Sequence, residues 1–309
     1  MTDAPAAVLV VGAGPAGISA ALWLNDFGVP FDWVDSSGDI GGMLHRVHNQ
    51  ITNYAAGSFD DGAQLVESFR QPLNDQGLAV REATVERIRP GPDHVAVNFD
   101  GRDMMRYEVV LLATGTRYRQ LGVPGEQQGL DDGYVSQSAT SDGARFAGRD
   151  VAVVGGGDAG FENAIRLASH GCRVTMLLRN PDFSARPAFV EQVREHPAID
   201  IAPIPTIVEA VEPTNDGCRL HLQRVDEPAT MKVAALFVRI GVDPVLPAGC
   251  EDLKTDDEGY VVVDQRGYTS DERVLAAGDV TTTVLPSIAV AVGQGARAAR
   301  TSAEALNYL

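Results

Sequence analysis

The sequence predicts an α/β fold with two Rossmann-like, three-layer ββα dinucleotide-binding domains. Two observations carry this prediction. Apolar, β-branched runs lead into glycine-rich turns at residues 7–17 and again at residues 151–160, and each turn is followed by helical sequence and a second apolar run. Further short apolar runs at residues 109–113 and 274–277 supply more buried strands. One glycine-rich turn is weak evidence, but two complete strand–turn–helix–strand units in one chain are much more specific.

The first unit reads AVLVVGAGPAGISAALWLNDFGVPFDWVD and ends at Asp35. Gly12 allows the tight turn, Gly14 lets the backbone approach a pyrophosphate, and Gly17 lets the helix pack closely on the strand. Asp35 follows about twenty residues on, where a carboxylate accepts hydrogen bonds from a ribose. An ordinary glycine-rich turn is the alternative, but the order of strand, turn, helix, strand and acid favours a dinucleotide site.

Composition narrows the class of protein. The chain has 309 residues, 44% of them hydrophobic and 22% charged, which describes a globular protein long enough for two domains. A formal net charge of −17 argues against nucleic acid or an anionic membrane as the main partner. No apolar run approaches the roughly 18 residues of a membrane span, and the opening residues lack a secretory leader pattern. We therefore expect a cytoplasmic protein.

The three cysteines, Cys172, Cys218 and Cys250, are isolated in the sequence. Without a CxxC pair they indicate neither a disulfide framework nor a zinc site, and no other metal site is expected. Buried, inert thiols are the expected state for all three.

The segment after the first unit passes through Gly41 and Gly42, which let the chain approach a bound ligand. The following residues, HRVHNQITNYAAG, are polar without periodicity and predict a loop. His45 and His48 are candidates for acid–base chemistry near a redox centre, although a loop histidine is more often solvated.

Helical spacing follows at residues 61–73, and short strands are expected over residues 77–106, with turns at Gly91-Pro92 and Asp100-Gly101. The run VVLLA at residues 109–113 is a buried strand that leads into Thr114-Gly115. Such a small turn fits close approach to a cofactor, but a simple turn explains it equally well.

The second unit reads VAVVGGGDAGFENAIRLASHGCRVTMLLR, with Gly155, Gly157 and Gly160 in the phosphate-turn positions. Its second strand ends in Arg179 instead of an acid, and Arg186 follows nearby. An arginine pairs with a 2′-phosphate that an acid would repel, so NADPH is favoured over NADH at this site. The alternative is that Arg179 is a solvated surface residue.

Strand-like segments continue to Ile240-Gly241, and the strand at residues 274–277 ends at Gly278-Asp279. Residues 287–306 are alanine-rich with helical spacing. If Gly293 and Gly295 open that helix, its N-terminus faces a cofactor.

Together these motifs resemble the low-molecular-weight thioredoxin reductases of the two-dinucleotide-binding-domain flavoprotein superfamily. The shared stretches are GAGPAG, GGML followed by NY, LLATG, VVGGGDAGFENA, VTMLLR and AAGDV, which cover essentially the whole chain. The resemblance implies a discontinuous FAD domain over residues 1–115 and 242–309, an inserted NAD(P)H domain over residues 116–241, and a homodimer.

The resemblance also assigns cofactor residues. FAD would be held by Gly12, Gly14, Pro15, Ala16, Gly17, Asp35, Gly41, Gly42, Met43, Leu44, Asn53, Val85, Ala113, Thr114, Gly115, Gly278, Asp279, Ser287 and Ile288. NADPH, with NADH as the alternative, would be held by Gly155, Gly157, Asp158, Ala159, Gly160, Glu162, Arg179 and Arg186.

One departure decides the expected chemistry. The reductases carry a C-A-T-C-D-G run, whereas this chain reads S-A-T-S-D-G from Ser138 to Gly143. A serine hydroxyl forms no disulfide, so reduction of thioredoxin by the family's dithiol route is not expected. Asp142 and His48 remain the candidate catalytic residues. Two other motifs also differ, because Leu178-Arg179-Asn180 replaces H-R-R and Pro286-Ser287 replaces R-Q.

Three functions are compatible with these residues. The leading one is an FAD-dependent NAD(P)H oxidoreductase that passes electrons directly to an external acceptor, either a ferredoxin- or flavodoxin-like protein or a small molecule. The second is a flavin-dependent oxidase or dehydrogenase that a small-molecule substrate reduces. The third is a non-catalytic redox or nucleotide sensor.

Overall fold

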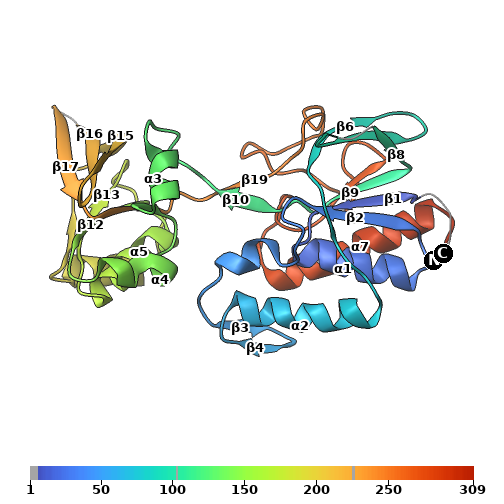
Figure 1. Cartoon of the computed structure of the whole chain (residues 1–309), viewed down its shortest axis with the longest axis horizontal. Helices are drawn as coiled ribbons and strands as arrows, with labels where there is room; N and C mark the ends of the chain where they lie inside the picture. The colour runs from blue at the N-terminus through green and yellow to red at the C-terminus, as the bar shows by residue number, and fades with distance from the viewer. Residues whose placement is uncertain (1–5, 102–103, 225–226) are drawn as a thin grey trace. The chain divides into compact units, whose positions relative to one another are not determined.

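The computed structural model describes residues 6–101, 104–224 and 227–309, and the chain divides into two compact units (Figure 1). We call them the split unit, which combines the described residues up to Arg117 with Asp243–Leu309, and the inserted unit, Tyr118–Val242. Two connecting strands, β10 (Thr116–Tyr118) and β19 (Val242–Pro244), pair with each other. Which cofactor each unit binds stays a prediction.

The split unit has three layers. Its elements are β1 (Val8–Val11), α1 (Pro15–Asp26), β2 (Phe31–Asp35), the 3₁₀ helix η1 (Gly42–Arg46), β3 (Ile51–Tyr54), β4 (Gly57–Phe59), α2 (Gly62–Asp75), β5 (Arg81–Glu82), β6 (Val85–Pro90), β7 (Val95–Phe99), β8 (Met105–Tyr107), β9 (Val109–Leu112), β20 (Val274–Ala276) and α7 (Ile288–Ala305). The central sheet is parallel, in the order β20-β9-β1-β2-β5.

Strand β1 shows why this sheet has no polar face. Val8 and Val10 pack in the core with α1 and α7, while Leu9 and Val11 pack in a second core with the antiparallel sheet β6-β7-β8. Helices therefore cover one face and strands cover the other (Figure 1). A strand buried on both faces must be continuously apolar, as VLVV is.

The inserted unit repeats this architecture. Its elements are α3 (Glu126–Asp132), β11 (Val135–Ser136), α4 (Ala139–Asp142), the 3₁₀ helix η2 (Gly143–Phe146), β12 (Asp150–Val154), α5 (Asp158–Ser169), β13 (Arg173–Leu177), α6 (Pro187–Glu195), β14 (Ile199–Ile201), β15 (Thr206–Thr214), β16 (Gly217–Arg224), β17 (Pro228–Val233) and β18 (Ala235–Val238). The central sheet, β11-β18-β12-β13-β14, is parallel. Val151 and Val153 pack with α5, and Ala152 packs with β15-β16-β17, so the predicted α/β class with Rossmann-like units is confirmed.

Two local predictions were wrong. The segment predicted as a loop contains the hairpin β3–β4, whose strands are too short and irregular to show a period in sequence. Gly293 and Gly295 do not open α7, which begins at Ile288 with Ser287 as its cap. A Cβ at Gly295 would overlap the carbonyl of Ala16, so this glycine lets α7 approach α1.

Other elements follow the sequence pattern. The helix predicted at residues 61–73 is α2, and the strands predicted over residues 77–106 are β5 to β8, with residues 102–103 outside the described chain. The strand-like segments up to residue 240 are β14 to β18, with residues 225–226 also outside the described chain.

Among the helices of the described residues, none combines the length and apolar character of a membrane span. The described part of the chain likewise holds no cluster of three or more His, Cys, Asp or Glu side chains arranged to bind a metal.

Candidate cofactor sites

A cavity of about 440 Å³ in the split unit lies where β1 and β9 end and α1 begins. Of the residues assigned to FAD, it is lined by Gly14, Pro15, Ala16, Asp35, Gly42, Met43, Leu44, Ala113, Thr114, Gly115, Gly278, Asp279, Ser287 and Ile288. The lining also includes residues that the sequence did not assign to FAD: Ala13, Ser36, Ser37, His45, Val47, Thr116, Pro286 and Ala291. Segments from both ends of the chain therefore meet in one pocket.

The glycines of the first turn have different structural roles. Gly12 has φ +107°, and a Cβ there would overlap the carbonyl of Ala113. A Cβ at Gly17 would overlap the carbonyl of Gly12, so this position needs glycine for close packing. Gly14 instead faces open space, and the Cβ position of Gly42 lies 3.2 Å from the Cα of Gly14. These two glycines leave the backbone accessible beside the first turn of α1, where amide groups attract anions.

Asp35 holds the turn in place. One carboxylate oxygen accepts a hydrogen bond from the Ala13 amide at 2.8 Å, and the other accepts from the amide and hydroxyl of Ser37 at 2.8 and 2.6 Å. The Trp33 indole adds a hydrogen bond to the carbonyl of Gly12 at 3.0 Å. The polar groups at the end of β2 therefore fix the loop that forms the pocket wall.

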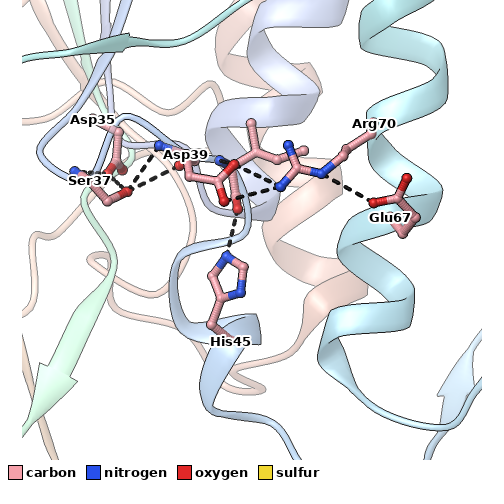
Figure 2. A network of polar contacts seen from close by, with 7 residues as sticks. Asp35, Ser37, Asp39, His45, Glu67 and Arg70 are labelled. Carbon is pink, nitrogen blue, oxygen red and sulfur yellow. Dashed lines mark hydrogen bonds and ion pairs between the residues drawn. The ribbon is translucent and has the colours of Figure 1, made fainter.

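The loop after β2 is also tied to α2, as Figure 2 shows. Asp39 forms an ion pair with Arg70 at 2.8 Å, and Arg70 contacts Glu67 at 3.3 Å. Burial pushes the pKa of Asp39 upward, but hydrogen bonds from Arg70 and from the Ile40 amide, together with the charge of Arg70, outweigh it and hold that pKa below its usual range. Nε2 of His45 lies 2.8 Å from the carbonyl oxygen of Ile40 and so carries a hydrogen.

Asp279 is the free polar group of this pocket. Burial raises the pKa of its carboxyl group, and no described residue forms a hydrogen bond with it. Asp279 is half-buried, so its carboxyl group is partly desolvated and is available to accept a hydrogen bond from a ligand in the pocket. The open glycine backbone at one end and this carboxyl group inside the pocket fit FAD, which has a pyrophosphate and a hydroxyl-bearing chain.

Several predicted residues lie outside the lining. Gly12, Gly17 and Gly41 shape the backbone beneath it, because a Cβ at each would overlap or crowd its neighbours. Asn53 is exposed on β3, and Val85 is buried in the core under β6. His48 is exposed and outside the cavity, whereas His45 lines it.

The glycine turn of the inserted unit has matching geometry. Gly155 has φ +144°, and a Cβ there would overlap the carbonyl of Arg239. A Cβ at Gly160 would overlap the carbonyl of Gly155, and Gly157 caps α5 without a side-chain hydrogen bond. Ala159 and Glu162 follow in the first turns of this helix. The turn therefore presents backbone amide groups at the carboxyl end of β12.

Arg186 and Arg179 differ in how their charges are compensated. The amide of Arg186 donates to Asp158 at 2.7 Å, its guanidinium pairs with the same carboxylate at 2.7 Å, and it stacks on Phe189 at 4.7 Å. Asp158 therefore neutralises one of the two arginines that the sequence assigned to NADPH. Arg179, just after β13, is exposed and has no ion pair or hydrogen bond among the described residues.

The serine-containing segment forms a local hydrogen-bond cluster in the inserted unit. Ser138 caps α4 by accepting from the amide of Ser141 at 3.3 Å, and the Ser141 hydroxyl donates to the Ser138 carbonyl at 3.2 Å. Asn163 on α5 accepts from the amide of Ala139 at 2.7 Å. The carboxylate of Asp142 accepts from the Ser136 hydroxyl at 2.6 Å.

All three cysteines are free and buried. Burial raises the pKa of Cys218 and of Cys250 to about 12, and it also raises the pKa of Cys172. These thiols are therefore uncharged near neutral pH and do not replace a redox-active pair.

Comparison with known proteins gives the family and the fold. A family model described as pyridine nucleotide-disulphide oxidoreductase matches residues 6–295. A bifunctional thioredoxin reductase/thioredoxin of Mycobacterium leprae is 33% identical over 297 residues, which is 94% of this chain and 64% of that protein. An NADH dehydrogenase of Ferdinandcohnia aciditolerans is 30% identical over 299 residues, which is 96% of this chain and 56% of that protein.

The crystal structure of Lactococcus lactis thioredoxin reductase in its FR conformation has a TM-score of 0.81 and 25% identity, and the match covers 99% of this chain and 100% of that one. The chain thus matches a whole solved structure, but it spans only 56% and 64% of the two curated relatives.

Proposed function

The chain belongs to the pyridine nucleotide-disulphide oxidoreductase family, and we propose that it transfers electrons from NAD(P)H through FAD directly to an external acceptor, without a protein dithiol. The predicted resemblance to thioredoxin reductases is confirmed by the M. leprae and L. lactis proteins. Proteins of this family use FAD with NADH or NADPH. The proposed acceptor is a small redox protein or a small molecule, and the proposed assembly is a homodimer.

The observation that carries the proposal is the state of Ser138 and Ser141. Both hydroxyls are engaged in the cap of α4, and oxygen in place of sulfur leaves no disulfide to receive electrons. The buried, uncharged thiols offer no substitute. Electrons that enter this protein must therefore leave from the flavin.

In this proposal the pocket of the split unit holds FAD. Gly14 and Gly42 leave room for the pyrophosphate, Asp35 keeps the turn in shape, and Asp279 supplies the free carboxyl group for the hydroxyl-bearing chain. When bound, FAD supplies the redox chemistry by taking two electrons from a nicotinamide and releasing them to the acceptor. The apolar walls at Leu44, Val47 and Ile288 exclude water from this site.

The nicotinamide nucleotide is assigned to the glycine turn of the inserted unit, with NADPH preferred. Arg179 has an uncompensated charge at the end of β13, where a 2′-phosphate would lie. Arg186 contributes less, because Asp158 already neutralises it.

Two groups are candidates for proton handling. Asp142 accepts from Ser136, and its other oxygen lies 3.9 Å from Arg145. In the flavin pocket, His45 replaces His48 as the candidate because only His45 lines the cavity. Its Nε2 is held by the carbonyl of Ile40, and within the described chain no residue forms a hydrogen bond with its Nδ1.

Anaerobic stopped-flow mixing of the FAD-loaded protein with NADPH or NADH tests this proposal. Rapid bleaching of the flavin, faster with NADPH, is the expected result, followed by reoxidation when an external acceptor is added. If neither nucleotide bleaches a flavin that dithionite reduces, the proposal fails and a substrate-reduced oxidase or a sensor remains.

The number of electrons taken up separates a dithiol-free enzyme from a dithiol enzyme. The wild type should accept two electrons per flavin in an anaerobic titration. The double variant Ser138→Cys/Ser141→Cys is the matched control, because it restores the thiol pair at the same cap and adds one two-electron couple. A wild type that takes up four electrons would contradict the absence of a second redox centre.

A further inference from the structure

Arg239 lies against the glycine turn of the inserted unit, although no motif points to it. It directly follows β18, and its amide donates to the carbonyl of Val154 at 2.8 Å. Its own carbonyl occupies the space where a Cβ of Gly155 would be. Its backbone is therefore held at the carboxyl end of the central strand, beside the turn.

The order of the strands shows that Arg239 lies where a parallel sheet of this kind binds a nucleotide. Strand β13 and strand β18 flank β12 on opposite sides, so the direction of the chain's winding reverses between β12 and β18. In open parallel sheets a nucleotide binds in the crevice at such a switch point. Arg239 lies on the β18 side of this crevice, and Arg179 lies on the β13 side.

The side chain of Arg239 is restrained but its charge is not compensated. The guanidinium stacks on the ring of Tyr118 at 4.6 Å, and Nη1 donates to the carbonyl of Gln137 at 2.9 Å. Nε is buried without a hydrogen-bond partner, and within the described chain no carboxylate pairs with this arginine. Arg239 as a whole is half-buried, and a partly desolvated cation with an unsatisfied buried donor is costly to leave without an anion.

We propose that Arg239 binds the pyrophosphate of the nicotinamide dinucleotide, next to the amide groups of the glycine turn and from the nicotinamide side. This inference rests on the proposed function and adds a binding residue to it. A phosphate group supplies the missing charge and accepts from the free N–H groups of the guanidinium, whose planar fork suits two phosphate oxygens. Tyr118 and Gln137 hold the guanidinium in place, so little side-chain entropy is lost on binding.

Isothermal titration of the full-length, FAD-loaded, oxidised protein tests this assignment without any turnover. The probes are NADP⁺, 2′-phospho-ADP-ribose, which keeps the diphosphate but lacks nicotinamide, and 2′-AMP, which lacks the diphosphate. Arg239→Gln should weaken the first two by about tenfold or more and leave 2′-AMP unchanged, as expected for loss of a charge-assisted hydrogen bond. Arg239→Lys, which keeps the charge but not the fork, should lie between wild type and Arg239→Gln.

Two further variants complete the experiment. Arg179→Gln should weaken all three probes, since each carries the 2′-phosphate. Arg173→Gln is the matched control, because Arg173 pairs with Asp150 at the opposite end of β12 and β13, and it should change none of them. If the wild type prefers NAD⁺, that nucleotide replaces NADP⁺, ADP-ribose replaces 2′-phospho-ADP-ribose, and adenosine replaces 2′-AMP. Without nucleotide, Arg239→Gln should melt no lower than wild type, since it removes a half-buried charge that no carboxylate compensates; if it melts lower, Arg239→Lys carries the test.

The titrations distinguish failure of the proposed function from failure of the role assigned to Arg239. A wild type that binds neither NADP⁺ nor NAD⁺ overturns the proposed function itself. A wild type that binds, with an Arg239→Gln variant that binds both diphosphate probes equally well, overturns only the role of Arg239. Equal weakening of 2′-AMP, or weakening of NADP⁺ without weakening of 2′-phospho-ADP-ribose, would also overturn the assignment to the pyrophosphate.

Discussion

Asp279 couples the pocket of the split unit to the pH dependence of stability. Because burial raises its pKa, the folded protein binds a proton more tightly than the unfolded chain does. The stability that the protonated group contributes is complete at low pH and is lost as the pH rises through the folded pKa. At neutral pH the FAD-free protein therefore contains a carboxylate whose burial is not compensated.

Asp279→Asn should remove the free-energy cost of desolvating this carboxylate, because asparagine is uncharged. In FAD-free protein the variant should melt a few degrees higher than wild type near neutral pH, since about 1 kcal/mol corresponds to roughly 2–4 °C for a domain of 150–250 residues. The difference should shrink as the pH is lowered from neutral into the acid range, because protonation removes the charge of Asp279 in the folded protein first. Thermal melts across this pH range test the prediction, and a difference that does not vary with pH would contradict it. The same variant should bind FAD more weakly.

Single residues also show where sequence reasoning succeeds and where it stops. Asp35 and Asp279 were found because each stands at the end of an apolar run in a motif with a fixed order. Arg239 was missed, because in LFVRIG it looks like an ordinary residue at a strand end. Its position depends on β18 pairing with β12, which joins segments that are far apart in the chain. The choice between His45 and His48 likewise needed the loop conformation.

At the scale of elements, the contact between α1 and α7 depends on one glycine. Gly295→Ala places a methyl group against the carbonyl of Ala16, which lines the pocket of the split unit, so the helices must separate. We expect a loss of roughly 1–3 kcal/mol in the free energy of unfolding and weaker retention of FAD. Gly293→Ala is the matched control in the same helix, because nothing lies within 4 Å of its Cβ position.

The control should move stability in the opposite direction. Gly293→Ala reduces the freedom of the unfolded chain without a clash, and should raise the free energy of unfolding by roughly 0.5–1 kcal/mol. Urea denaturation of each variant measures its free energy of unfolding. Flavin absorbance, followed in the same samples, measures how well each variant retains FAD. Equal effects of the two substitutions would show that α1 and α7 do not need the close approach at residue 295.

At the scale of the whole molecule, the architecture was predictable because the same pattern occurs twice. The runs VLVV and VAVV leave no polar position, and such strands are stable only when both faces are covered. The short hairpin β3–β4 was not predictable, since its few residues show no period. Packing specifies its strands: Tyr54 contacts Phe59 across the hairpin and Phe69 on α2.

Net charge is the property of the whole molecule that bears on the acceptor. With 42 acidic and 25 basic residues, the protein carries a formal charge of −17 and repels anions approaching from solvent. Reoxidation of the prereduced enzyme should therefore respond to salt in opposite directions for acceptors of opposite charge. The rate with hexaammineruthenium(III), a cation, should fall as salt is added, and the rate with ferricyanide, an anion, should rise.

Salt screens these interactions strongly, since the Debye length shortens from about 30 Å at 0.01 M to about 3 Å at 1 M. Across this range we expect changes of about tenfold in each rate. Stopped-flow measurements on prereduced enzyme isolate this step from the binding of NADPH, which is itself an anion. If both rates change in the same direction, the net charge does not control access to the flavin. If the rate falls with the cationic acceptor and rises with the anionic one, a protein acceptor for this enzyme should present a basic surface.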